Sequence, residues 1–129
     1  MNRPPRPLLR LLLPLLIASW AGSSHALDCK NAMSTPDINE CAAIGQKKVE
    51  DKLNLAYQDT LKYFNDPEDA GTKKSLIAAQ RAWVKFREAD CNAVYEQWKT
   101  GTIRTVMFIE CMQKRAETRI KELEDYQPR

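Results

Sequence analysis

The chain has 129 residues, which is enough for one domain. It carries 20 Lys and Arg against 17 Asp and Glu, a formal net charge of +3, and residues 1–26 account for the excess with three Arg and no acidic residue. Residues 27–129 therefore balance 17 basic with 17 acidic side chains, which argues against a nucleic-acid-binding protein that neutralises phosphates.

Residues 1–26 have the three-part pattern of a secretory signal peptide. A basic segment, Met1–Arg10, precedes the apolar Leu11–Trp20, and Ser24-His25-Ala26 predicts cleavage after Ala26. The apolar run is shorter than the about 20 residues of a membrane-spanning helix. A lipid anchor on Cys29 is not expected, because Asp28 rather than a small residue precedes it. We therefore expect residues 27–129 to form an exported domain, periplasmic or secreted, without a membrane anchor.

Proline and glycine divide residues 27–129 into three segments with helical periodicity. Thr35-Pro36-Asp37 predicts the start of the first helix, with Thr35 as its N-cap, and Asn65-Asp66-Pro67 ends it. A second helix begins at Gly71-Thr72, and Thr100-Gly101-Thr102 separates it from a third. Apolar residues recur every three or four positions in all three segments, and no window keeps a strand-like alternation. The pattern predicts an all-α fold, an elongated up-down-up three-helix bundle.

Cys29, Cys41, Cys91 and Cys111 are an even set in an exported chain, which predicts two disulfides. Their separations of 12, 50 and 20 residues, with no His after residue 26, argue against a metal site. The two turns set an axial register that puts Cys41 one turn from Cys91, and Cys91 beside Cys111. We favour Cys41–Cys91 with Cys29–Cys111. The alternatives are Cys29–Cys41 with Cys91–Cys111, and Cys29–Cys91 with Cys41–Cys111.

The same register brings four side chains to one level in the middle of the rod. They are Asn54, Gln80, Trp83 and Arg119. Arg87 follows one turn after Trp83, and we expect it to stack on that ring and to pair with Asp90 or Glu88. Polar residues inside a bundle usually bond across helices, so the favoured interpretation of this level is structural. The alternative is a ligand groove that opens onto it.

Four segments of the chain form a family-like pattern. They are N-x-C-A at Asn39–Ala42, L-N-x-x-Y at Leu53–Tyr57, Q-R-A-W-V-K-F-R-E-A-D-C at Gln80–Cys91, and C-x6-T-R-x3-L from Cys111 to Leu123. This set resembles the LprI-type lysozyme-inhibitor N-terminal domain family and spans nearly all of residues 27–129. The motif positions outside the cysteines include Leu53, Asn54, Tyr57, Gln80, Trp83, Arg87 and Arg119. The resemblance implies a small, exported, disulfide-bonded helical domain, in a family named for inhibition of lysozyme.

Catalytic chemistry is not expected. Residues 27–129 lack His, the four cysteines are assigned to disulfides, and no phosphate-binding loop, dinucleotide fingerprint or zinc-protease motif occurs. The sequence therefore predicts a protein that is not an enzyme and needs no cofactor or metal.

The acidic turn, Asp66–Asp69, is the predicted contact with a protein partner. It offers Asp66, Glu68 and Asp69 on a short loop stiffened by Pro67. Such a loop fits a cationic cell-wall lytic enzyme of the lysozyme type. The alternative function is an envelope structural or stress module that binds another protein partner and does not inhibit lysozyme.

Overall fold

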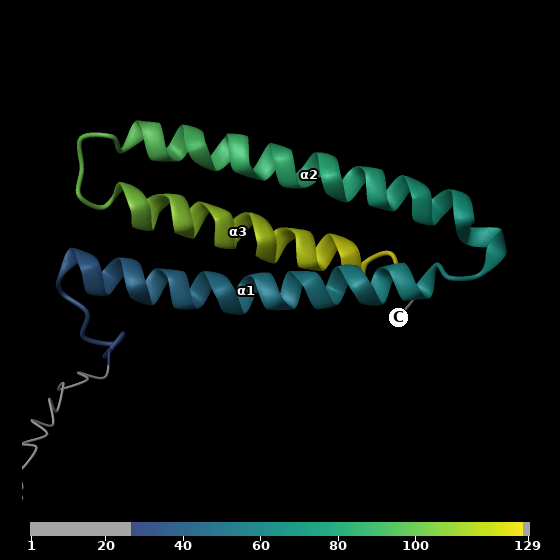
Figure 1. Ribbon diagram of the computed structural model, residues 1–129, viewed down its shortest axis with the longest axis horizontal. Coiled ribbons are helices and arrows are strands. Elements are labelled where there is room, and N and C mark those ends of the chain that lie inside the picture. Colours follow the sequence, from purple (N-terminus) through teal and green to yellow (C-terminus); the bar gives the residue numbers. More distant parts are fainter. Residues whose placement is uncertain (1–26, 128–129) are drawn as a thin grey trace, which may run out of the picture.

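The computed structural model describes residues 27–127, which form three long helices and one short helical turn (Figure 1). The helices are α1 (Thr35–Tyr63), α2 (Ala70–Gln97) and α3 (Arg104–Glu124), and the 3₁₀ turn η1 spans Pro67–Asp69. No strand occurs between residues 27 and 127, so the predicted all-α up-down-up fold is confirmed. The predicted signal peptide and its cleavage site lie outside the described residues.

Local sequence explains where α1 begins. Ser34, not Thr35, is its N-cap: the Ser34 hydroxyl oxygen accepts from the Asp37 amide at 3.2 Å and donates to the Asp37 carboxylate at 2.6 Å. Thr35 is the first helical residue, and Pro36 follows within the first turn, where its missing N–H costs no hydrogen bond. The N-cap therefore lies one residue before the predicted one.

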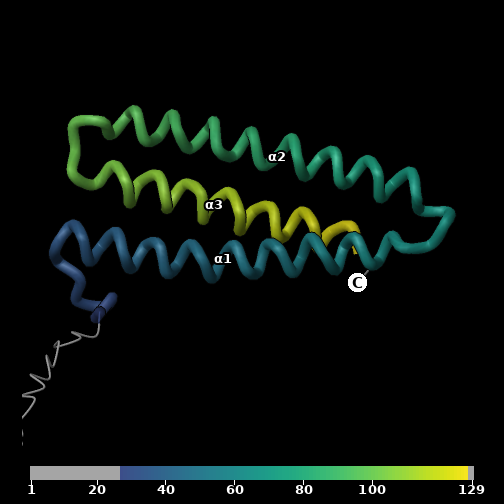
Figure 2. Tube along the Cα trace, in the orientation of Figure 1, coloured from purple at the N-terminus to yellow at the C-terminus, as the bar shows by residue number. Residues whose placement is uncertain are grey.

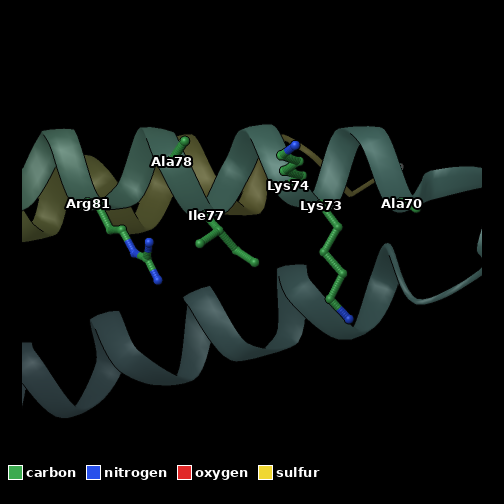
Figure 3. Close-up of a pocket in the computed structure, with 6 residues that line it drawn as sticks. All are labelled: Ala70, Lys73, Lys74, Ile77, Ala78 and Arg81. Atoms are coloured by element: carbon green, nitrogen blue, oxygen red, sulfur yellow. The ribbon is translucent and has the colours of Figure 1, made fainter.

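The third helix in sequence lies between the other two. Figures 1 and 2 show α3 running parallel to α1 and antiparallel to α2, with both neighbours beside it. By contrast, α1 and α2 make little direct contact, although a short turn joins them. Side chains of α2 such as Ile77 and Arg81 instead project toward α1 across an open groove (Figure 3). The bundle is therefore asymmetric, with α3 as its packing centre.

The apolar core is small and draws on all three helices. Leu53 of α1, Leu76 of α2, and Ala116 and Leu123 of α3 are buried. Partly buried neighbours surround them: Val49, Ala56, Tyr57, Leu61, Phe64, Trp83 and Ile120. Thr60 is fully buried, and its hydroxyl lies 3.1 Å from the Leu123 carbonyl, which satisfies a backbone acceptor near the end of α3. The end of α3 is thus fixed against α1.

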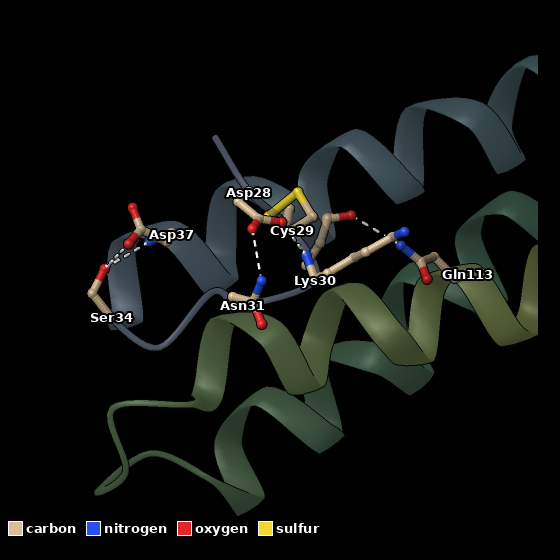
Figure 4. Close-up of a disulfide and its surroundings, with 9 residues drawn as sticks. Asp28, Cys29, Lys30, Asn31, Ser34, Asp37 and Gln113 are labelled. Carbon is tan, nitrogen blue, oxygen red and sulfur yellow. Dashed lines mark hydrogen bonds between the residues drawn. A yellow bond between two sulfur atoms is a disulfide. The ribbon is translucent and has the colours of Figure 1, made fainter. Parts of the chain in front are cut away.

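The structure contains two disulfides, as predicted, but the cysteines pair differently from the pairing that we favoured. Cys29 pairs with Cys41 and Cys91 with Cys111, at Cα–Cα distances of 5.5 and 5.6 Å. The expected Cys41–Cys91 and Cys29–Cys111 links are wrong because α3 lies between α1 and α2, and because residues 29–34 fold back along α1 (Figure 4). One disulfide therefore closes the N-terminal segment, and the other joins α2 to α3.

Asp28 stabilises the folded-back N-terminal segment. Its carboxylate accepts hydrogen bonds from the Asn31 side-chain amide at 2.7 Å and from the Lys30 backbone amide at 3.0 Å (Figure 4). These bonds favour the charged carboxylate, the Asn31 bond most of all, and so lower the pKa of Asp28 below its ordinary value. The Cys29–Cys41 disulfide and the ionised Asp28 carboxylate thus hold the turn before α1.

Candidate functional site

The middle of the rod holds two buried guanidinium groups near one indole ring. The Arg87 guanidinium carbon lies 4.8 Å from the centre of the Trp83 ring, and that of Arg119 lies 5.9 Å away. The predicted stacking of Arg87 on Trp83 is therefore present. Both Arg residues are more than nine-tenths buried, so each positive charge needs partners within the protein.

Arg87 finds its partner on α1. Its Nη1 atom lies 2.7 Å from Oε1 of Glu50, and the same carboxylate oxygen accepts from the Gln46 side-chain amide at 2.7 Å. The predicted pairing with Asp90 or Glu88 is wrong, because Asp90 turns to α3 and binds Arg115 at 2.7 Å. The Arg87–Glu50 ion pair spans the side of the bundle where α1 and α2 are otherwise apart.

Glu50 was missed by the sequence reasoning, although a signal for it existed. The first turn sets a register in which Glu50 lies opposite position 86, directly beside Arg87. The prediction considered only partners of Arg87 on its own helix, α2. A charged side chain at a buried helical position needs a partner within the protein, and Arg87 finds its partner across the bundle in Glu50.

Arg119 connects α3 to α2. Its Nε atom donates to the Gln80 side-chain oxygen at 2.9 Å in a buried hydrogen bond, and its Nη1 atom lies 2.9 Å from the Glu122 carboxylate. Gln80, Trp83 and Arg119 thus meet as the register predicts. Asn54 is exposed and makes no hydrogen bond to them, so this part of the prediction is wrong. The bonds favour the structural interpretation of this level, since they tie α2 to both neighbours.

The remaining motif residues on α1 serve the core and its edge. Leu53 is 3% exposed and belongs to the buried cluster. Tyr57 is half-buried and packs on that cluster, and it also borders a hollow of about 470 Å³ that faces Gln80 and Val84 of α2. The L-N-x-x-Y motif therefore supplies packing at Leu53 and Tyr57.

The acidic turn lies at the end of the rod where α1 passes into α2. Asp66 and Glu68 are exposed and Asp69 is half-buried. The Asp69 amide donates to the Asp66 carbonyl at 3.0 Å, which closes η1 behind Pro67. The three carboxylates therefore project from a backbone that is already ordered.

The C-terminal end of α3 adds acidic residues to the same end of the rod. The Tyr126 ring packs edge-on against Phe64 at 6.1 Å, which holds this end of α3 beside the end of α1. Glu122 and Glu124 lie here, near the negative end of the helix dipole, and the Glu122 carboxylate pairs with Arg119 at 2.9 Å. Glu124 therefore adds an exposed carboxylate to the end of the rod that carries the acidic turn.

One group of residues has the composition of a metal site. Asp90, Cys91 and Cys111 bring a carboxylate oxygen and two sulfurs within 4.8 Å of one another. However, the two sulfurs form a disulfide and the carboxylate binds Arg115. These atoms are therefore committed to structural bonds.

Within the described part of the chain, no helix is long and apolar enough to cross a membrane.

Comparisons with known proteins find related sequences. The chain is similar to a protein of Rhizobium meliloti (strain 1021), uncharacterized protein R02472, with 28% identity over 76% of this chain and 77% of the relative. It is also similar to uncharacterized protein YecT of Escherichia coli (strain K12), with 27% identity over 77% of this chain and 71% of the relative. No solved structure matches the chain.

A family model described as lysozyme inhibitor LprI matches residues 28–123, which include all four cysteines and the three helices except Glu124, the last residue of α3. The matched range also contains Gln80, Trp83, Arg87 and Arg119, the residues whose stacking and hydrogen bonds join the helices. The chain belongs to the lysozyme inhibitor LprI family.

Proposed function

We propose that this protein is an exported, non-enzymatic binding protein that inhibits a lysozyme or a related cell-wall lytic enzyme. The observation that carries the proposal is membership of the lysozyme inhibitor LprI family over residues 28–123. The two disulfides support export to the periplasm or the exterior, because such bonds persist in oxidising compartments. The absence of His from residues 27–129 supports a role without His-based acid–base catalysis.

The acidic turn is the contact that we propose. Asp66 and Glu68 are exposed at the tip of the rod, and Pro67 and η1 hold their backbone in one conformation. An ordered loop loses little conformational entropy when it enters a cleft, which favours affinity. Glu124, which is exposed at the end of α3, extends the negative charge at this end of the molecule, which favours a cationic partner and faster association.

The test is a titration of the domain, residues 27–129, against several lysozyme types in a cell-wall lysis assay. We expect at least one lysozyme to be inhibited, and we expect the Asp66→Ala/Glu68→Ala/Asp69→Ala variant to inhibit it about tenfold more weakly at low salt. The difference should shrink as salt rises, because exposed charges are screened over about 8 Å at physiological ionic strength.

A matched control removes the same charge elsewhere. Glu88→Ala/Glu110→Ala/Glu117→Ala also deletes three exposed carboxylates, from α2 and α3, and should inhibit like the parent. Equal inhibition by both triple variants would move the contact away from the turn. A parent protein that inhibits none of the lysozymes would remove the proposed function itself.

A second candidate function is an envelope interaction module that binds a different protein. The observation that favours it is the exposure of apolar side chains on α2, where Phe86 is 56% and Val84 is 42% exposed. Under this function the partner binds along the side of the rod. Inhibition by the parent and its loss in the turn variant would decide against it.

A further inference from the structure

A groove runs along α2. Residues of α2 alone line one part of it, and Tyr57 of α1 joins the wall of the other part. Two adjoining hollows of about 420 and 470 Å³ form it, and Arg81 borders both. Lys73, Ile77 and Arg81 project from α2 toward α1 across this space (Figure 3). On α2 the groove extends from Ala70 to Lys85, about 22 Å along the helix axis.

The α2 wall of the groove is positively charged and lacks internal counter-ions. Lys74, Arg81 and Lys85 are exposed and form no ion pair with any residue from 27 to 127. Lys73 bonds only a neutral amide, the Asn65 side-chain oxygen at 3.0 Å. Lys73 and Arg81 point toward α1 and Lys74 points away from it (Figure 3), so the wall presents Lys73, Arg81 and Lys85 to whatever occupies the groove.

Acidic residues on α1 do not neutralise this wall. Glu50 binds Arg87, Asp51 binds Lys47, and Asp59 binds Lys62, at distances of 2.7–3.1 Å. The side chain that α1 contributes to the larger hollow is the neutral Tyr57. Moreover, Arg81 and Lys85 are four residues apart on one helix, and like charges at this spacing repel by about 0.2–0.5 kcal/mol. The row of cations is thus a cost to folding.

The groove also has apolar surface. Ile77 and Tyr57 are half-buried, and Val84 is 42% exposed within the hollow. A simple polyanion would gain nothing from these side chains. An amphipathic segment would cover them with one face and pair with the cations on another.

We propose that the groove along α2, which Tyr57 of α1 borders at one part, binds an acidic amphipathic helix of a partner protein. The carboxylates of that helix face Lys73, Arg81 and Lys85, and its apolar side chains cover Ile77 and Tyr57. A helix fits because α2 packs on α3 but makes little contact with α1, so a fourth helix that covers this face of α2 completes the bundle. The proposal does not rest on lysozyme inhibition, since the acidic turn takes no part in it.

The experiment uses a fluorescein-labelled helical peptide of about 16 residues, built from Glu, Leu and Ala with its Leu residues on one face. Fluorescence anisotropy should show saturable binding to the folded, disulfide-bonded protein. Reversing two groove charges, Arg81→Glu/Lys85→Glu, should weaken binding at least about tenfold. The control is Lys48→Glu/Lys52→Glu, which reverses an exposed pair of lysines at the same spacing on α1 and should leave binding unchanged.

Three outcomes would overturn the proposal. The first is equal binding of the parent and the groove variant. The second is equal binding of a peptide with the same composition and scattered Leu residues, which would reduce the groove to a general anion attractor. The third is a dimer in sedimentation velocity that the groove variant abolishes, because the groove would then be occupied by a second copy. The neutral variant Arg81→Gln/Lys85→Gln, with an unchanged melting curve, guards against misfolding of the charge-reversed protein.

Discussion

The two buried arginines are the residues that most strongly specify how the helices face one another. Arg87 bonds Glu50 on α1, Arg119 bonds Gln80 on α2, and both guanidinium groups lie near the Trp83 ring. A buried charge without a partner is far more costly than an exposed one. A shift of any helix by one turn would separate these pairs, so the native register is favoured over its neighbours.

We predict that the Arg87–Glu50 ion pair contributes measurably to stability. Glu50 is 28% and Arg87 is 9% exposed, so water screens the pair only in part. A double-mutant cycle with Arg87→Met and Glu50→Gln, followed by urea unfolding, should give a coupling free energy of about 2 kcal/mol.

The matched control is the Lys47–Asp51 pair, whose side chains are 77% and 61% exposed. The same cycle with Lys47→Met and Asp51→Asn should give less than about 0.5 kcal/mol. Equal coupling in the two cycles would mean that packing on Trp83, and not the ion pair, fixes Arg87.

Among the elements, the two disulfides have different structural roles. Cys91–Cys111 joins α2 to α3, the helices that pack on each other near the second turn. Cys29–Cys41 links a short N-terminal segment to α1, the helix that directly follows it in sequence. The first should therefore stabilise the bundle as a whole, and the second should mainly order residues 29–34.

We predict that Cys91→Ser/Cys111→Ser lowers the free energy of unfolding by about 3 kcal/mol, as expected for a closed loop of this size. Cys29→Ser/Cys41→Ser should cause a smaller loss, because its loop lies outside the packed helices. Chemical denaturation followed by circular dichroism measures both changes. Peptide mapping without reductant should recover the two pairs named here, and a larger loss in the second variant would contradict the assigned roles.

Helix boundaries could be predicted from the sequence because Pro67, Gly101 and the residues around them break helices locally. Disulfide pairing could not, because all of Cys41, Cys91 and Cys111 lie near one axial level and the choice depends on which helices are neighbours. The groove could not be predicted for the same reason, since the periodicity of each helix does not show which helices are neighbours. Register did predict that Gln80 meets Arg119, because that pair depends only on the turn between α2 and α3.

At the scale of the whole molecule, α3 is the helix on which the fold depends. It packs on both α1 and α2, whereas those two make little contact with each other. Ala116 and Leu123 of α3 are completely buried between them. An α1–α2 hairpin without α3 would expose most of the core, and isolated helices are marginal in water.

We predict that a chain of residues 27–102, with Cys91→Ser to avoid a free thiol, loses most of its helical circular dichroism signal. The full domain with Cys91→Ser/Cys111→Ser is the reference, because it lacks the same disulfide but keeps α3. A truncated chain that stays as helical per residue as this reference would show that α1 and α2 fold as an independent unit.

The folded-back N-terminal segment and the acidic turn lie at opposite ends of α1 (Figure 1). With 29 residues in this helix, about 43 Å separates the two ends. A chain attached to a surface through its N-terminal side would therefore hold Asp66 and Glu68 outward at the full length of the rod. Attachment near Ala70 would instead turn the carboxylates toward the surface, so the orientation of a tag or tether decides whether this tip can be reached.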